Sequence, residues 1–94
     1  LASDYNPGSS PSGNMNFINA LACIQMNMTP EESINASTIN SAFAMDLSHS
    51  HGSITKGKVA NLILSENIES FYNISYGFGR AQIDTVFVNG EVYI

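Results

Sequence analysis

The chain has 94 residues, a formal charge of −5 and 12% charged residues, against roughly 25% in an average soluble domain. Its three basic residues, Lys56, Lys58 and Arg80, do not form the cation cluster that nucleic acid or an anionic membrane surface requires, so we expect neither as a partner. The single cysteine, Cys23, excludes an internal disulfide and a thiolate metal cluster, and it favours a reducing, cytoplasmic setting.

The chain opens with a short apolar run, residues 1–3, that leads directly into Asp4 and then into a loop rich in Asn, Pro, Gly and Ser. This order is typical of a βα unit, and in a (β/α)₈ barrel the residues at the carboxyl end of a strand face the active site. The alternative is that Asp4 caps a turn with Asn6 and Gly8, as short polar side chains commonly do. Taken alone, the residues favour the turn.

A helix is predicted from Met15, because apolar residues recur there at helical spacing. They form one stripe: Phe17, Ile18, Leu21, Ile24 and Met28. We expect Ser12 or Gly13 to cap the start of this helix. Cys23 lies within the apolar stretch and is expected to be buried as a small hydrophobic residue.

A second helix is predicted to begin at Pro30. Thr29 precedes it and Glu32 follows three residues later, which is the pattern of a capping box with proline at the first helical position. Its apolar period continues to about residues 46–50, where Ser, His and Gly interrupt it. We therefore expect one helix over this stretch.

The pattern changes to strands after Gly52. Lys56 and Lys58 flank Gly57 in a predicted exposed turn, and residues 60–64 form an apolar run of strand length. Residues 66–80 stay ambiguous because two glycines interrupt them. Residues 83–94 predict a β-hairpin around Asn-Gly, the preferred type I′ pair. Two helices and three or four strands are too few to bury all their apolar faces against one another.

The pair His49 and His51 has the spacing of metal ligands on a strand, yet it lies in a polar connector without an obvious third ligand. A solvated loop is therefore the favoured interpretation. The chain also has no Gly-x-Ser-x-Gly elbow and no Lys-containing phosphate loop, which argues against a serine hydrolase and a nucleotide site.

Three segments resemble motifs of the amidohydrolase superfamily: residues 28–36 (MTPEESINA), residues 52–63 (GSITKGKVANLI) and residues 83–90 (IDTVFVNG). The opening segment, residues 3–11 (SDYNPGSSP), narrows the resemblance to a branch that hydrolyses a cyclic amide. The resemblance implies an α+β fragment from the carboxyl-terminal part of such an enzyme. Residues 1–47 would be the last strand and helices of a (β/α)₈ TIM-like barrel, and residues 48–94 the last strands of a small composite β-sandwich.

The same resemblance implies roles for the opening loop. Asp4 matches a metal-ligating and catalytic aspartate, and Asn6, Gly8 and Ser9 match positions that line the substrate. The metal would be zinc or iron, which lowers the pKa of bound water to about 7. His49 and His51 match no metal ligand of the family.

Because a catalytic metal needs about three protein ligands, the fragment alone is expected to be inactive. The resemblance further implies a small-molecule substrate and a homo-oligomer. Two other interpretations remain: a different metal-dependent cyclic-amide hydrolase or deaminase, and a non-catalytic interaction module that pairs through the hairpin.

Overall fold

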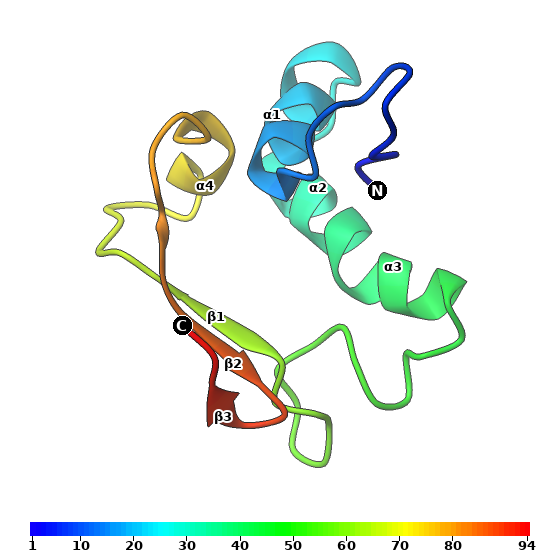
Figure 1. The fold of residues 1–94 in the computed structure, drawn as a ribbon, viewed down its shortest axis with the longest axis vertical. Helices are drawn as coiled ribbons and strands as arrows, with labels where there is room; N and C mark the ends of the chain where they lie inside the picture. Colours follow the sequence, from blue (N-terminus) through cyan, green and yellow to red (C-terminus); the bar gives the residue numbers. More distant parts are fainter.

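A computed structural model describes residues 1–94 of the chain. In chain order, its elements are α1 (Met15–Gln25), α2 (Pro30–Ser37), α3 (Ile39–Ala44), β1 (Leu62–Ser65), α4 (Asn73–Tyr76), β2 (Ile83–Val88) and β3 (Glu91–Val92). The first three helices follow one another along one side of the molecule, and the sheet lies apart from them (Figure 1). The short α4 lies beside α1 and connects the two parts. None of the four helices is long and apolar enough to cross a membrane.

Helix α1 is capped by Asn14, so the prediction of Ser12 or Gly13 is wrong. The Asn14 side chain accepts hydrogen bonds from the main-chain N–H groups of Asn16 (3.0 Å) and Phe17 (3.3 Å). Ser12 instead accepts from the N–H of Asn14 itself, at 3.1 Å. The serine therefore orders the residue that caps the helix rather than capping the helix directly.

The capping box at the start of α2 is confirmed. Thr29 Oγ1 accepts from the N–H of Glu32 at 3.2 Å, and Glu32 Oε2 accepts from the N–H of Thr29 at 2.8 Å. Pro30 is the first helical residue, where its missing N–H costs nothing. This local pattern is strong because both partners lie within three residues of each other.

The prediction of one continuous helix after Pro30 is wrong, because the chain breaks between α2 and α3. Thr38 leaves helical geometry there, with φ −117° and ψ −87°. Its hydroxyl donates to the carbonyl of Ile34 at 2.7 Å, and the hydroxyl of Ser37 donates to the carbonyl of Ser33 at 2.9 Å. Such side chain to main chain bonds compete with the helical ladder and bend helices.

The sheet has the order β1-β2-β3 and is antiparallel throughout. Leu62 of β1 lies opposite Phe87 of β2, and β2 turns into β3 through Asn89 and Gly90. These two residues have φ of 54° and 83°, as a type I′ turn requires, so the predicted hairpin is confirmed. The ambiguous stretch before the hairpin contains α4.

The buried apolar core consists of Ala20, Ala22 and Ala42 alone. The predicted apolar stripe of α1 is largely uncovered: Ile24 is 58% exposed, and Phe17 keeps partial cover through ring contact with Phe78, whose centroid is 5.3 Å away. Cys23 is half-buried rather than buried. The chain therefore leaves much of its apolar surface in contact with solvent, as its length led us to expect.

Candidate functional site

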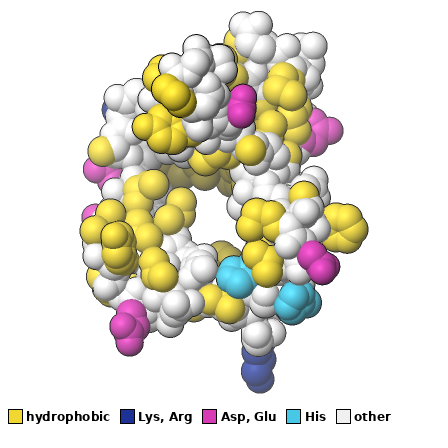
Figure 2. All heavy atoms as spheres, turned by 45° about the vertical axis from the view of Figure 1, so that its right-hand side comes forward, with side chains coloured by type: hydrophobic (Ala, Val, Ile, Leu, Met, Phe, Trp, Pro, Cys, Tyr) yellow, Lys and Arg dark blue, Asp and Glu magenta, His cyan; other side chains and the backbone are white.

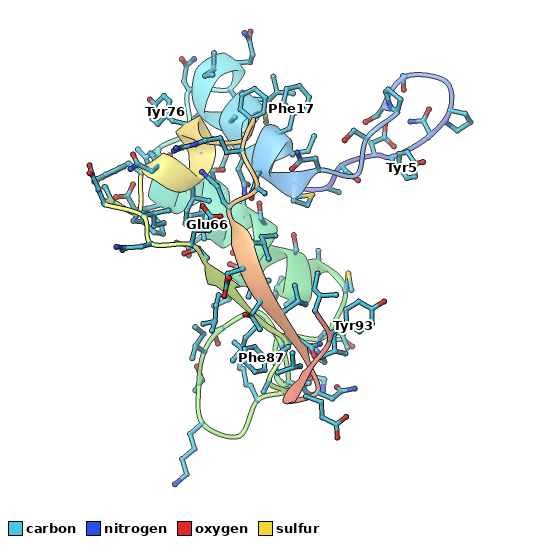
Figure 3. All side chains as sticks on the ribbon, turned by 60° about the vertical axis from the view of Figure 1, so that its left-hand side comes forward. Tyr5, Phe17, Glu66, Tyr76, Phe87 and Tyr93 are labelled. Carbon is cyan, nitrogen blue, oxygen red and sulfur yellow. The ribbon has the colours of Figure 1, made fainter.

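The opening segment forms a loop that projects from the helices, with Tyr5 at its outer side (Figures 1 and 3). Two opposing stretches of this loop are joined by a main-chain bond from Asn6 N to Ser10 O, at 2.9 Å. The Asn6 side chain fills the turn between them. Its Oδ1 accepts from the N–H groups of Gly8 (2.9 Å) and Ser9 (2.8 Å). The loop is thus ordered by its own polar atoms.

The residue that caps this turn is Asn6, not Asp4 as the turn interpretation held. Asp4 contributes only its main-chain oxygen, which accepts from Asn6 Nδ2. The Asp4 carboxylate is exposed and has no hydrogen-bond partner in the chain. Its main chain takes the left-handed conformation, with φ 50°, which few residues other than Gly, Asn and Asp adopt readily. The carboxylate is therefore free to bind a ligand.

The structure places all four predicted site residues on this one loop: Asp4, Asn6, Gly8 and Ser9. The polar atoms of the last three, however, bond to one another. Asn6 Nδ2 also donates to Ser9 Oγ at 3.2 Å. A substrate that binds here must exchange some of these bonds for its own. The strand expected for residues 1–3 has no pairing partner within the chain and stays a prediction.

Sequence reasoning missed Ser10, which lies at the base of the loop. Its hydroxyl donates to the carbonyl of Ser3 at 2.8 Å, and it is half-buried. No spacing rule pairs these residues, because the bond spans seven positions of irregular chain. The only available signal was the density of serine in the loop, which does not say which hydroxyl is used.

The fit of a metal ion to this chain is partial. A carboxylate oxygen is a ligand that both zinc and iron accept, and Asp4 offers one without competition from a protein donor. No group of three or more His, Cys, Asp or Glu side chains converges anywhere in the 94 residues. His49 is exposed, and His51 Nδ1 lies 2.8 Å from Ser50 Oγ. Within these 94 residues, therefore, no set of side chains could hold a catalytic metal by itself.

Lys58 binds the connector that carries the two histidines. The prediction that the Lys58 side chain is exposed in a turn is therefore wrong. Its ammonium donates to the carbonyls of Ser48 (2.7 Å) and His51 (3.0 Å), and the residue is half-buried. The turn itself is present at Gly57. The burial of this lysine was not predictable, because its partners are main-chain carbonyls, which every residue has and which leave no signal in the sequence.

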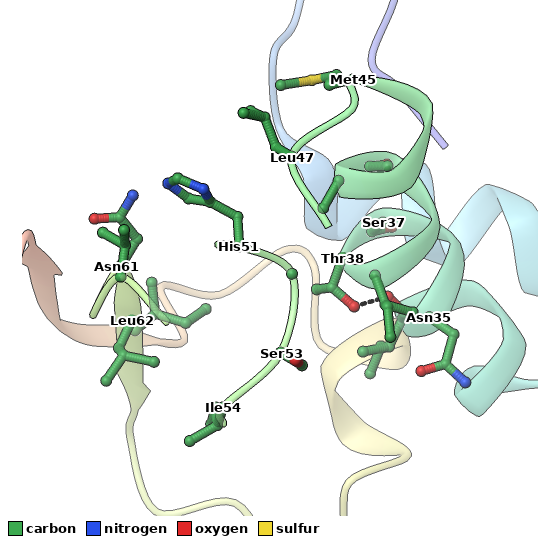
Figure 4. Close-up of a pocket in the computed structure, with 17 residues that line it drawn as sticks. Asn35, Ser37, Thr38, Met45, Leu47, His51, Ser53, Ile54, Asn61 and Leu62 are labelled. Carbon is green, nitrogen blue, oxygen red and sulfur yellow. Dashed lines mark hydrogen bonds between the residues drawn. The ribbon is translucent and has the colours of Figure 1, made fainter. Parts of the chain in front are cut away.

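A groove of about 610 Å³ opens between the α2–α3 helices and the segment that leads into β1 (Figure 4). Hydrophobic side chains gather around this hollow on the molecular surface (Figure 2). Apolar side chains on both walls include Ile34, Ile39, Met45, Leu47, Ile54, Val59, Leu62 and Ile63. The only titratable side chain among the lining residues is His51, and none of the four predicted site residues is among them. The groove therefore offers packing surface rather than a set of reactive groups.

Comparison with known proteins gives a consistent result. Residues 1–93 match the amidohydrolase family. Over 92 residues the chain is 61% identical to the imidazolonepropionase of Christiangramia forsetii and 62% identical to that of Flavobacterium johnsoniae. It is also 43% identical over 94 residues to the imidazolonepropionase of Alkaliphilus oremlandii. These matches cover 98–100% of this chain, and the chain spans 22% of the length of each relative.

Proposed function

The chain belongs to the amidohydrolase family, and from that premise we propose that it forms the carboxyl-terminal part of an imidazolonepropionase. The observation that carries this proposal is the close similarity to relatives of that name along essentially the whole chain. The free Asp4 carboxylate agrees with it. The reaction would be hydrolysis of the ring amide C–N bond of 4-imidazolone-5-propanoate, giving N-formimidoyl-L-glutamate, in histidine degradation.

Members of the family are generally metal-dependent. When bound, zinc or iron supplies Lewis-acid activation of water at neutral pH. Asp4 would be one ligand, and a carboxylate oxygen of Asp4 would accept the proton that water loses and deliver it to the ring nitrogen as the C–N bond breaks. The exposed carboxylate, whose oxygens have no protein partner, supports this double use.

Asn6, Gly8 and Ser9 would contact the polar ends of substrate or product. Their present hydrogen bonds hold three donors, the N–H groups of Gly8 and Ser9 and the amide of Asn6, within one turn. A substrate oxygen could take the place of Asn6 Oδ1 as the acceptor for those N–H groups. Substrate binding would then remodel a turn that is already closed, rather than order a disordered loop.

We further propose that the helical part, residues 1–47, ends the enzyme's barrel and that residues 48–94 complete a small β-sandwich. The helices α1–α3 and the three strands divide at this boundary, and an apolar groove separates them. The contact of α4 with α1 crosses the boundary, so the two parts would not be independent. The whole enzyme would be a homo-oligomer.

A hybrid enzyme tests the function directly. In it, this chain replaces the matching 92-residue segment of the C. forsetii imidazolonepropionase. We expect the hybrid to hydrolyse 4-imidazolone-5-propanoate, with product followed by mass spectrometry. Asp4→Asn should lower kcat/KM by about 10³-fold through loss of the ligand and proton acceptor, whereas Glu91→Gln, a change at an exposed carboxylate on β3, should not.

A hybrid that folds and binds metal but does not open the imidazolone ring would contradict the proposed substrate. Turnover of another cyclic amide, or deamination, would then identify the alternative enzyme. A hybrid that folds without binding metal would favour the interaction module. The chain by itself is expected to be inactive, since it supplies one ligand of about three.

A further inference from the structure

Ser10 forms hydrogen bonds on both sides of Asp4. Its hydroxyl donates to the carbonyl of Ser3 at 2.8 Å, and its own carbonyl accepts from the N–H of Asn6 at 2.9 Å. Ser3 and Asn6 are the residues one before and two after the carboxylate. One residue therefore holds the chain at both ends of the short segment that presents Asp4.

Asp4 needs such support because its main chain is in the left-handed region, with φ 50°. Aspartate adopts that conformation more readily than most residues, yet it is still a minority conformation that neighbouring hydrogen bonds help to keep. The neighbouring hydroxyl of Ser9 cannot do so, because it bonds to the Asn6 side chain within the turn. Ser10 is the serine of this loop whose hydroxyl reaches the chain before Asp4.

We propose that Ser10 is a positioning residue for the Asp4 carboxylate. Its hydroxyl holds the Ser3–Asp4 peptide, and with it the main-chain position from which the Asp4 side chain would reach the metal. The inference rests on the proposed function, since it takes Asp4 as a metal ligand. Partners that orient a ligand in this way contribute to metal affinity although they never touch the metal.

The test uses the full-length hybrid enzyme with Ser10→Ala, Ser10→Thr and the control Ser53→Ala. Ser53 is matched because its hydroxyl also bonds within a loop, to Thr55 Oγ1 at 3.0 Å, but far along the chain from Asp4. The dissociation constant for Zn²⁺ is measured by competition with a chelator. We expect Ser10→Ala to weaken binding about 10-fold, Ser10→Thr to retain near-parental binding through its hydroxyl, and Ser53→Ala to leave it unchanged.

A role confined to folding would appear differently. It would lower the thermal midpoint of the metal-free enzyme and leave the Zn²⁺ dissociation constant of the folded fraction unchanged. That result, or a Ser10→Thr variant as impaired as Ser10→Ala, would overturn the proposal.

The binding measurement needs no turnover, so the two proposals fail separately. Zn²⁺ binding that depends on Ser10, without hydrolysis of imidazolone, would overturn only the proposed substrate. Hydrolysis with Zn²⁺ binding that is insensitive to Ser10 would overturn only the positioning role.

Discussion

Two regions of the molecule differ in which side chains they bury: the contact between α1 and α2, and the groove between α3 and β1. At the first, polar side chains are buried: Asn19 is 6% exposed and Ser33 is fully buried, and Ser33 Oγ donates to Asn19 Oδ1 at 3.0 Å. At the second, apolar side chains face open space, and Ile54 is 90% exposed. The buried residues of this chain are therefore small or polar, and no large hydrophobic side chain is among them.

The difference indicates which surface the chain buries against its own elements. The α1–α2 contact closes because small side chains satisfy one another's hydrogen bonds. The groove stays open because its apolar walls have no third element to pack against. Exposed apolar surface of this kind is typical of places where a protein binds other polypeptide or a ligand.

The largest effect should come from a substitution in the groove wall, Gly52→Ala. An added Cβ would lie 2.7 Å from Ala42 Cβ and 3.0 Å from Ile39 Cα, at a residue with φ 89°. Overpacking and left-handed strain together should cost about 3 kcal/mol of the free energy of unfolding of the hybrid enzyme, measured by urea. Gly57→Ala is the control. The φ of Gly57, 92°, is similar, but a Cβ added there would meet no other residue within 4 Å.

The control isolates the role of packing. Gly57→Ala should cost about 1 kcal/mol from backbone strain alone. Equal losses at the two glycines would mean that the contact between Gly52 and α3 is not made in solution. The two parts of the molecule would then be less closely joined than the structure shows.

The next effect should come from the closed contact, through Asn19→Ala. The change removes the acceptor for the hydroxyls of Ser33 and Ser37, the first of which is fully buried. Ser33 Oγ would keep only its longer bond to the main-chain carbonyl of residue 19, at 3.3 Å, so the loss of the side-chain acceptor should cost about 1.5 kcal/mol in the same urea experiment. Gln25→Ala on the exposed side of α1 should change stability by less than about 0.5 kcal/mol. Similar small losses of stability at both positions would contradict a stabilising role for the buried hydrogen bonds between α1 and α2.

The sequence predicted best the features whose partners lie close together along the chain. The capping box joins Thr29 to Glu32, and the hairpin turn is set by Asn89 and Gly90. Both depend on residues no more than three positions apart, and both are confirmed. The break at Thr38 was missed because threonine is compatible with a helix until its hydroxyl bonds to the carbonyl four residues back.

Features that depend on distant residues were not predictable in the same way. Hydropathy predicted that the stripe of Phe17 and Ile24 is buried, but Phe17 is covered only in part, by Phe78, and Ile24 stays mostly exposed. Hydropathy gave no prediction for Asn19, although that residue is buried against α2. At the candidate site, the resemblance predicted roles for Asp4 and its neighbours, and these roles stay predictions. The bond of Ser10 to Ser3 was missed because it crosses an irregular loop.

A smaller effect is expected at the free edge of the sheet when the 94-residue chain is studied alone. Strand β1 pairs only with β2, and Ile63 on it is 59% exposed. We expect the chain to self-associate through this edge and its apolar surface, and Ile63→Lys to lower the association constant about tenfold, or about 1.4 kcal/mol. Sedimentation velocity over a concentration series measures this.

Thr55→Lys adds the same charge to an exposed turn and should leave the association constant unchanged. The comparison matters because any added lysine reduces the net charge of −5 and the repulsion between copies. A parent chain that remains monomeric at high concentration would contradict the expectation that the exposed apolar surface drives self-association.

The smallest effect concerns an exposed link between the two parts of the molecule, from Glu31 at the start of α2 to Tyr72 before α4. A main-chain hydrogen bond, and then a hydrogen bond from the Tyr72 phenol, hold the pKa of the Glu31 carboxyl below 4.5. The same pairing raises the pKa of Tyr72 above 10.0. Tyr72→Phe should move the Glu31 pKa toward its ordinary value without reaching it, because the main-chain bond remains.

The sign of the stability effect follows from these directions. A carboxyl whose pKa is lowered by folding stabilises the fold above its unfolded pKa of 4.5, and this is lost as the pH falls through the folded value. Tyr72 contributes below pH 10.0, and its contribution is lost as the pH rises through its raised pKa. A ¹³C NMR titration of the Glu31 carboxyl in the parent, Tyr72→Phe and the control Tyr76→Phe separates the phenol from the helix terminus. An unchanged Glu31 pKa in Tyr72→Phe would mean that the contact of α4 with α1, and not this pair, joins the two parts.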